Sequence, residues 1–152
     1  MSDAAADRVR ELLEQVSNAL GLGADVVVEQ NDDGIRGTLE GEELGLFIGR
    51  HGSTIDAVQH LAFKIANRDA ARDEAVRVTV DAAGYRDRRE QMLHRQADQA
   101  ADRAARSGRP VALDAMSATE RKVVHEYLKD REEVETYSEG TEPDRHLVVA
   151  PL

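Results

Sequence analysis

The feature that most constrains the fold is a repeated change of hydrophobic period along the first 80 or so residues. Apolar residues recur at helical spacing in some stretches, and alternate or run together as β-branched residues in others. The stretch 31–34, Asn-Asp-Asp-Gly, predicts a hairpin turn between two of the strands. These patterns predict, in chain order, a helix over 4–20, strands over 24–30 and 35–39, helices over 42–48 and 53–68, and a strand over 75–80. The helix over 53–68 is expected to bury one apolar stripe that includes Leu61.

The second half of the chain follows a different pattern. Residues 82–107 are rich in alanine, arginine and glutamine and contain no proline, which predicts one long helix with a thin apolar stripe that includes Met92. Ser117 and Glu120 form a capping-box pattern that opens a further helix to about residue 129. Short strands are expected over 111–113, 133–137 and 146–149. We therefore expect an α+β protein with two small domains, over 1–82 and 83–152.

Composition excludes several classes of protein. The chain of 152 residues contains no cysteine, which excludes disulfides and thiolate metal sites, and no apolar run approaches the length of a membrane span. The formal charge of −10 argues against a protein that coats DNA by charge alone, and 3% aromatic residues cannot build a wall of base-stacking rings. Residues 45–110 nevertheless carry 12 basic and 9 acidic side chains, whereas both flanking segments are acidic. An anionic ligand is expected at this middle third, with ordinary solvated faces as the alternative explanation.

The sharpest local feature is Gly49-Arg50-His51-Gly52, which lies between two expected helices. Glycines at both ends have no Cβ, so a sugar-phosphate chain can approach the main chain closely. Arg50 and His51 are expected to project from the loop as hydrogen-bond donors. A bare G-x-x-G is weak evidence, because most such spacings are turns between helices. Its position between two amphipathic helices flanked by strands strengthens the interpretation as a phosphate-binding loop.

The helix that follows this loop adds to the expected site. Ser53 or Thr54 opens it, and the amides and dipole of a helix N-terminus favour an anion. Beside the loop, Ile48, Ile55 and Val58 are expected to form an apolar floor for unstacked bases. Such a floor needs few aromatic rings, which agrees with the composition.

The order helix-strand-strand-helix-Gly-Arg-His-Gly-helix-strand resembles a type II KH domain. The run from Leu46 to Leu61, LFIGRHGSTIDAVQHL, is similar to the KH segment of the bacterial Jag/KhpB family (SpoIIIJ-associated proteins). This resemblance implies a GXXG loop that clamps about four nucleotides of single-stranded RNA. Lys64 and Arg68 are expected to extend the positive rim of the same groove.

A second pattern lies on the capped helix. Arg121 and His125 are four residues apart and share one helix face, although on spacing alone a surface arginine and an ordinary histidine are the simpler explanation. With the segments 134–140 and 145–149 that follow, they resemble the small single-strand-binding domain named for its Arg-x-x-x-His. In Jag/KhpB proteins that domain follows the KH domain directly. The resemblance implies a second phosphate contact formed by Arg121, His125 and Arg145.

The resemblance implies a cytoplasmic, non-enzymatic protein that binds single-stranded RNA, as a post-transcriptional regulator or RNA chaperone linked to cell elongation or division. Enzymatic motifs are incomplete. His125-Glu126 begins like a zinc-protease helix, but Lys129 occupies the position of the second histidine, and His94 with Asp98 supplies only two metal ligands. No G-x-S-x-G elbow is present. We expect no cofactor, no metal and no membrane insertion.

Two alternatives stay open on the sequence. The KH surface can serve as a protein-interaction adaptor, through a homodimer or a heterodimer with a small stand-alone KH protein, and the acidic first and last thirds of the chain favour this slightly. Single-stranded DNA also fits a KH groove, so the nucleic acid can be either RNA or DNA.

Overall fold

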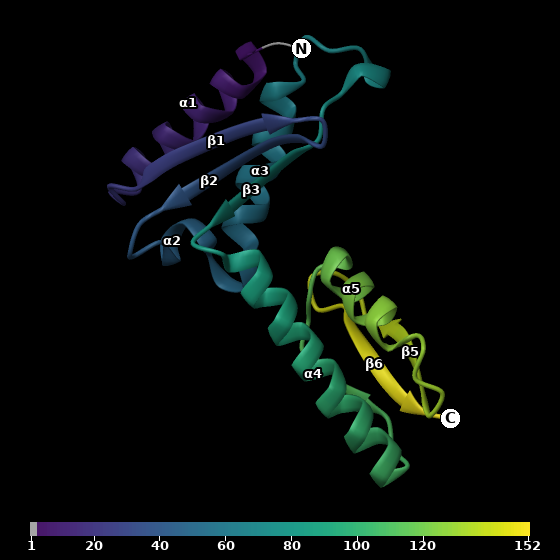
Figure 1. Ribbon diagram of the computed structural model, residues 1–152. Helices are drawn as coiled ribbons and strands as arrows, with labels where there is room; N and C mark the ends of the chain where they lie inside the picture. The colour runs from purple at the N-terminus through teal and green to yellow at the C-terminus, as the bar shows by residue number, and fades with distance from the viewer. Residues whose placement is uncertain (1–2) are drawn as a thin grey trace. The chain divides into compact units, whose positions relative to one another are not determined.

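A three-stranded sheet with two helices packed on one face forms the first unit of the chain (Figure 1). The computed structural model describes residues 3–152. Strand β2 lies in the middle of the sheet, antiparallel to β1 and parallel to β3. The elements of this unit are α1 (Asp3–Ala19), β1 (Asp25–Asn31), β2 (Gly34–Glu40), α2 (Gly45–Ile48), the 3-10 helix η1 (Arg50–Gly52), α3 (Ser53–Ala66), the 3-10 helix η2 (Arg72–Glu74) and β3 (Val78–Ala82).

The hairpin between β1 and β2 forms as its sequence predicts. Asn31 pairs with Gly34 across the turn, and the side chain of Asn31 accepts a hydrogen bond from the amide of Asp33 at 2.8 Å. The turn fixes the register of the two strands, so Ile35, Gly37 and Leu39 of β2 all face the helices. All three residues are buried, as this register requires.

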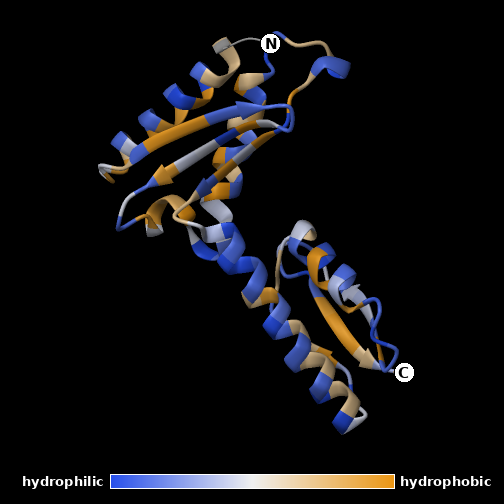
Figure 2. Cartoon of the chain, viewed as in Figure 1, coloured by the Kyte–Doolittle hydropathy of each residue, from blue (hydrophilic) through white to orange (hydrophobic). Residues whose placement is uncertain are grey.

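Helices α1 and α3 both contribute to one core beneath the sheet, and Figure 2 shows apolar residues on the strands and on the adjoining helix surfaces. A Cβ at Gly37 would lie 2.5 Å from Leu13 Cδ1, so glycine at this position lets α1 approach the middle strand closely. The sequence prediction was wrong about Leu61, which is 50% exposed. The residues of α3 that are buried are Ile55, Val58, Ala62 and Ala66.

The second unit begins at Asp87 and has its own sheet and core. Its strands lie in the order β4-β6-β5, and both pairings are antiparallel. The core contains Leu93 and four alanines of the long helix together with Val124, Leu128 and Val149. The elements are α4 (Tyr85–Ser107), whose first two residues belong to the first unit, β4 (Val111–Ala112), α5 (Ala118–Leu128), β5 (Val134–Glu139) and β6 (His146–Pro151).

The α+β fold and the expected order helix-strand-strand-helix-helix-strand, followed by a long helix and a smaller α/β unit, are thus confirmed. Two details of the second unit differ from the sequence prediction. Met92 lies outside the buried stripe of α4 and is 41% exposed. The capping box is half formed, because Ser117 Oγ accepts the Glu120 amide at 3.2 Å, whereas the Glu120 carboxylate binds Arg89. Along residues 3–152, none of the helices combines the length and the apolar composition that crossing a bilayer requires.

Candidate nucleic-acid interface

The loop between α2 and α3 takes a shape that only glycine allows at its first position. Gly49 has φ 72° and ψ 176°, a region that is essentially restricted to glycine. A Cβ added there would lie 2.4 Å from Thr54 Oγ1 and 2.8 Å from the Thr54 amide nitrogen. The main chain at Gly49 therefore folds directly against the first turn of α3.

The aromatic ring of Tyr85 packs against the second glycine of the loop, Gly52. Gly52 is buried with φ 80°, and a Cβ there would lie 2.8 Å from the Tyr85 hydroxyl oxygen and 3.0 Å from Tyr85 Cε2. Tyr85 itself packs against the core of the first unit. The sequence interpretation was that both glycines make room for a ligand. The structure gives a different reason for the two glycines. The space that a Cβ would take is filled by Thr54 at Gly49 and by Tyr85 at Gly52, and both are residues of this protein.

This packing leaves the two middle residues of the loop in solvent. Arg50 and His51 are both exposed, and His51 has a left-handed backbone with φ 54°. Helix α3 begins at Ser53 without a side-chain cap; the Ser53 amide donates to the Arg50 carbonyl, and the amides that follow it in the first turn are the ones an anion can reach. The structure brings Arg50, His51 and the N-terminus of α3 into one short segment, with Ser53 exposed and Thr54 half-buried behind it.

The expected apolar floor of this site is wrong. Ile55 is fully buried and Val58 is buried, so neither can touch a base, and the half-buried Ile48 packs against the same core. The apolar side chains that α2 and α3 do expose include Leu46, which is 67% exposed, and Leu61. Lys64 is exposed on α3, as is Arg68 just beyond its last turn.

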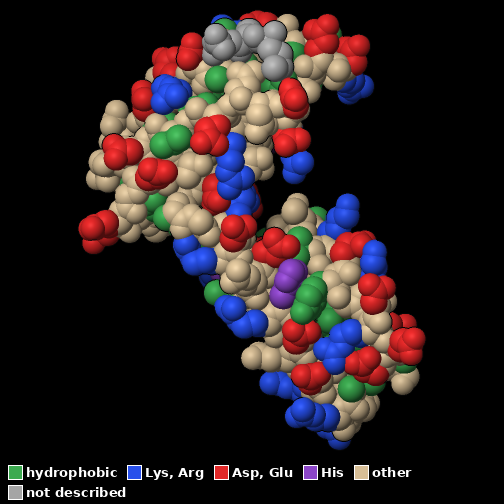
Figure 3. All heavy atoms as spheres, in the orientation of Figure 1, with side chains coloured by type: hydrophobic (Ala, Val, Ile, Leu, Met, Phe, Trp, Pro, Cys, Tyr) green, Lys and Arg blue, Asp and Glu red, His purple; other side chains and the backbone are tan. Residues whose placement is uncertain are grey.

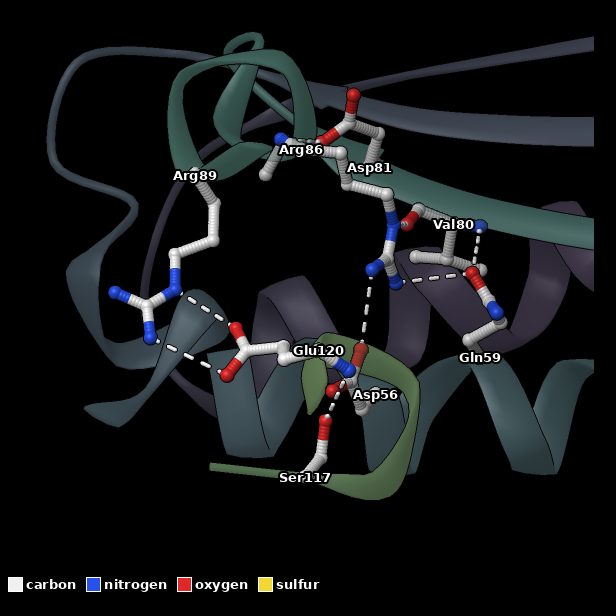
Figure 4. A network of polar contacts seen from close by, with 9 residues as sticks. Asp56, Gln59, Val80, Asp81, Arg86, Arg89, Ser117 and Glu120 are labelled. Carbon is white, nitrogen blue, oxygen red and sulfur yellow. Dashed lines mark hydrogen bonds and ion pairs between the residues drawn. The ribbon is translucent and has the colours of Figure 1, made fainter. Parts of the chain in front are cut away.

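Arg86 fastens helix α3, which follows the loop, to the edge strand β3 (Figure 4). Its guanidinium donates to the Val80 carbonyl at 2.8 Å, to Gln59 Oε1 at 2.9 Å and to Asp56 Oδ1 at 3.1 Å. Gln59 Oε1 also accepts the Val80 amide, and the buried carboxylate of Asp81 accepts the Arg86 amide at 3.2 Å. Asp56 is the acidic residue in the first turn of α3, so Arg86 offsets a negative charge beside the candidate anion site.

Sequence reasoning missed this role of Arg86, which falls within the long helix expected over 82–107. The local signal is weak. Asp56 and Gln59 are three residues apart on one helix, but Arg86 is 27 to 30 residues further along the chain.

In the second unit, Arg121 is buried and already paired. It is 8% exposed, with Nη1 donating to the Met116 carbonyl at 2.6 Å and Nη2 to Glu142 Oε1 at 2.8 Å. Glu142 is itself exposed and can move away. Because a phosphate has to compete with this carboxylate, the ion pair weakens the attraction of Arg121 for a nucleic acid.

The other two residues of the expected second contact are held by different elements. His125 is exposed on α5, and its Nδ1 hydrogen-bonds with Thr136 Oγ1 of β5. Arg145 donates to the Gly140 carbonyl at 2.6 Å. The Arg145 carbonyl accepts the amide of Met116, the residue whose carbonyl binds Arg121. The structure thus joins Arg121 and Arg145 through one residue and anchors His125 separately to β5.

Charges on the surface are mixed, as Figure 3 shows for one face of each unit. A dense group of ion pairs surrounds Arg131, which contacts Asp98 at 3.4 Å, Asp102 at 2.8 Å and Glu133 at 2.6 Å. The hydrogen bond from Arg131 lowers the pKa of Asp102, and the carboxylate of Glu133 is held below its usual pKa first by its own backbone amide and then by Arg131. This group ties α4 to the segment before β5.

The pair His94 and Asp98, noted in the sequence as two ligands at most, has a structural explanation. The His94 ring stacks on Tyr127 with centroids 4.0 Å apart, and the Tyr127 hydroxyl donates to Asp98 at 2.8 Å, which raises the pKa of Tyr127. Within the described part of the chain, no group of three or more histidine, cysteine, aspartate or glutamate side chains is placed to hold a metal ion.

Comparison with known proteins agrees with this division of the chain. Residues 6–81 match the KhpA/KhpB KH domain, and residues 91–151 match the R-3-H domain, which takes its name from the Arg-x-x-x-His motif. Similar proteins, each named RNA-binding protein KhpB, occur in Clostridium symbiosum (34% identical over 146 residues), Lactiplantibacillus plantarum (38% over 135) and Bacillus subtilis (31% over 140). These matches cover 95%, 89% and 91% of this chain but 65%, 41% and 66% of the respective relatives.

The KH match includes the glycine loop, and the second match includes the Arg-x-x-x-His helix and the strands after it. Both halves of the resemblance found in the sequence are therefore confirmed, in the expected order. The chain belongs to the KhpA/KhpB family of KH-domain proteins, with an Arg-x-x-x-His domain following its KH domain.

Proposed function

We propose that this chain is a non-enzymatic protein that binds single-stranded RNA at the Gly49–Gly52 loop. The observation that carries the proposal is the geometry of the loop. Thr54 and Tyr85 pack against the main chain of the loop at Gly49 and Gly52. Arg50 and His51 are left exposed next to the N-terminus of α3, which has no side-chain cap. A phosphate at this point gains helix amides and two side-chain donors.

The relatives support RNA as the ligand, because each is named an RNA-binding protein. A cytoplasmic location, where bacterial RNA is made, is part of the proposal. The finer roles, post-transcriptional regulation or RNA chaperoning linked to cell elongation or division, rest on the family resemblance.

The second unit contributes a weaker phosphate contact in this proposal. Arg121, His125 and Arg145 are its donors, but Glu142 neutralises Arg121 at 2.8 Å. A strand that reaches this unit has to displace a carboxylate, whereas no such ion pair involving Arg50 is observed among the contacts of residues 3–152. We therefore assign most of the affinity to the KH unit.

The alternative function is a protein-interaction adaptor. Leu46 and Leu61 expose apolar area on α2 and α3, which favours pairing with a second copy or with a small KH protein. The salt dependence of binding distinguishes the two functions. The affinity for a nucleic acid held through its phosphates falls steeply as the salt concentration rises, whereas the affinity of an apolar protein interface does not. Parallel titrations with DNA of the same sequence decide between RNA and DNA.

The test is the double substitution Arg50→Asp with His51→Asp, assayed by fluorescence anisotropy with a single-stranded RNA. Two charge-assisted contacts are each worth about 1.5–3 kcal/mol, so we expect a loss of affinity of about 100-fold or more. The control is Arg10→Asp with Arg77→Gln, which makes the same change in formal net charge, −2 and −1 with His51 counted as neutral, at two exposed arginines of the same unit outside the loop. Circular dichroism checks that both variants fold. Equal losses in the two variants would show that net charge, and not the loop, governs binding.

A further inference from the structure

A basic hollow of about 360 Å³ lies at the C-terminal end of α3, at the opposite end of the helix from the glycine loop. Phe63, Lys64, Arg68 and Arg72 line it together with Asn67 and three alanines. None of these eight described residues is acidic. The hollow lies entirely within the first unit.

The segment that forms the hollow is held in place by side-chain hydrogen bonds. The Asn67 side chain donates to the Val76 carbonyl at 3.0 Å and accepts the Val76 amide at 2.8 Å. These two bonds join the beginning and the end of the segment that connects α3 to β3. The nearby acid Asp69 is bound by Arg8 at 2.9 Å and by Arg68 Nε at 3.2 Å. Arg68 is therefore partly neutralised, and Lys64 and Arg72 are the stronger anion donors.

The partly exposed ring of Phe63 also lets the hollow form a stacking contact. The chain has two phenylalanines, of which Phe47 is fully buried and Phe63 is 36% exposed. A ring with cations beside it matches a nucleotide, because the base stacks on the ring and the phosphate pairs with the cations. A protein partner with an apolar surface would instead leave three positive charges to be desolvated.

The position of the hollow links it to the loop. Helix α3 has 14 residues, which corresponds to a length of about 20 Å. A GXXG loop holds about four nucleotides, and a strand that continues along α3 passes the exposed His60 and Leu61 before it reaches Lys64. His60 lies four positions before Lys64 and Leu61 lies three positions before it, so both share a helix face with Lys64.

We propose that this hollow is a nucleotide subsite, in which a base stacks on Phe63 and its phosphate binds Lys64 and Arg72. It extends the RNA-binding surface beyond the nucleotides held by the loop. The inference rests on the proposed function, because the strand has to be anchored at Gly49–Gly52 to reach the hollow.

The experiment compares single-stranded RNA oligomers of four and eight nucleotides on the full chain by fluorescence anisotropy. The quantity of interest is the ratio of the two affinities, measured for the wild type, Phe63→Leu and Phe63→Tyr. An eight-nucleotide strand can bind in more registers than a shorter one, but this statistical gain is the same for all three proteins and cancels. Leucine keeps the apolar volume without the ring, and tyrosine keeps the ring.

Stacking of one base corresponds to a gain of about fivefold or more. We expect Phe63→Leu to lower the affinity ratio by at least that factor through weaker binding of the longer strand, with the four-nucleotide affinity unchanged. Phe63→Tyr should keep the wild-type ratio, and Arg72→Ala should reduce the salt dependence for the longer strand alone. An unchanged ratio in Phe63→Leu overturns the subsite while the loop assignment stands. Failure of the wild type to bind either oligomer overturns the proposed function and the subsite together.

Discussion

Replacing Gly49 by alanine tests how tightly the loop geometry is specified. The dihedral angles of Gly49, φ 72° and ψ 176°, cost any other residue about 1–3 kcal/mol. The added Cβ would also meet Thr54, at 2.4 Å from Oγ1 and 2.8 Å from the amide nitrogen. A side chain can rotate away, but the amide belongs to the first turn of α3 and cannot move without shifting the helix. Such overpacking adds about 1–3 kcal/mol, so we expect Gly49→Ala to lower the free energy of unfolding by about 2 kcal/mol or more.

Two other glycines of the same unit separate the sources of this cost. Gly45 opens α2 with open space around its Cβ position and no unusual φ, so Gly45→Ala should be neutral or stabilise the unit by about 0.5–1 kcal/mol. Gly21 has φ 67° but also faces open space, so Gly21→Ala should cost only the dihedral strain of about 1–2 kcal/mol. The difference between Gly49→Ala and Gly21→Ala then measures the steric contact with Thr54 together with the additional backbone strain of the Gly49 conformation.

Hydrogen exchange read by mass spectrometry is the suitable assay, because it reports on the amides of α3 separately from those of the second unit. The slowest amides of α3 give the unfolding free energy of the first unit. In thermal melts the same loss corresponds to about 8 °C or more for a unit of this size. If Gly49→Ala lies within about 0.5 kcal/mol of Gly45→Ala, the reasoning about the loop is refuted.

Three further predictions follow from the ion pairs. Arg86→Met should lower the unfolding free energy of the first unit by about 2 kcal/mol, since it removes the guanidinium hydrogen bonds to Asp56, Gln59 and the Val80 carbonyl; an unchanged α3 exchange rate would contradict this. The pKa of Asp102 lies below its ordinary value of 3.8, so its contribution to stability is complete above about pH 4 and is lost as the pH falls through the lower folded-state pKa. Melts between about pH 5 and pH 2.5 should show that loss, and Arg131→Met should reduce it. Glu142→Gln should raise RNA affinity about 2- to 5-fold by releasing Arg121, unless the second unit makes no phosphate contact.

Local patterns predict the elements of this fold well. The hairpin at 31–34 and the helix that opens at Ser117 depend on residues a few positions apart, and the structure places both as expected. The expected strand over 75–80 is displaced, because the structure has β3 at Val78–Ala82 with η2 just before it. Strand ends depend on pairing with β2, which is remote in sequence.

The details of the candidate site are set by tertiary packing. Periodicity identifies an apolar stripe on α3, but the rotation of the helix over the sheet decides that Ile55 is buried and Leu61 is exposed. The partners of ion pairs are equally remote. Arg89 binds Glu120 at a separation of 31 residues, and Arg121 binds Glu142 at a separation of 21. No local pattern in the sequence predicts such pairs, so the ion pair of Arg121 with Glu142 could not be predicted.

The most direct test of the account is an NMR titration of the full chain with a short single-stranded RNA. The account predicts that the amides of Gly49 to Ser53 shift first and furthest, and that a duplex of the same sequence leaves them nearly unchanged. Saturating shifts confined to residues 87–152, with the loop amides unmoved, would contradict the central claim that the glycine loop binds the strand.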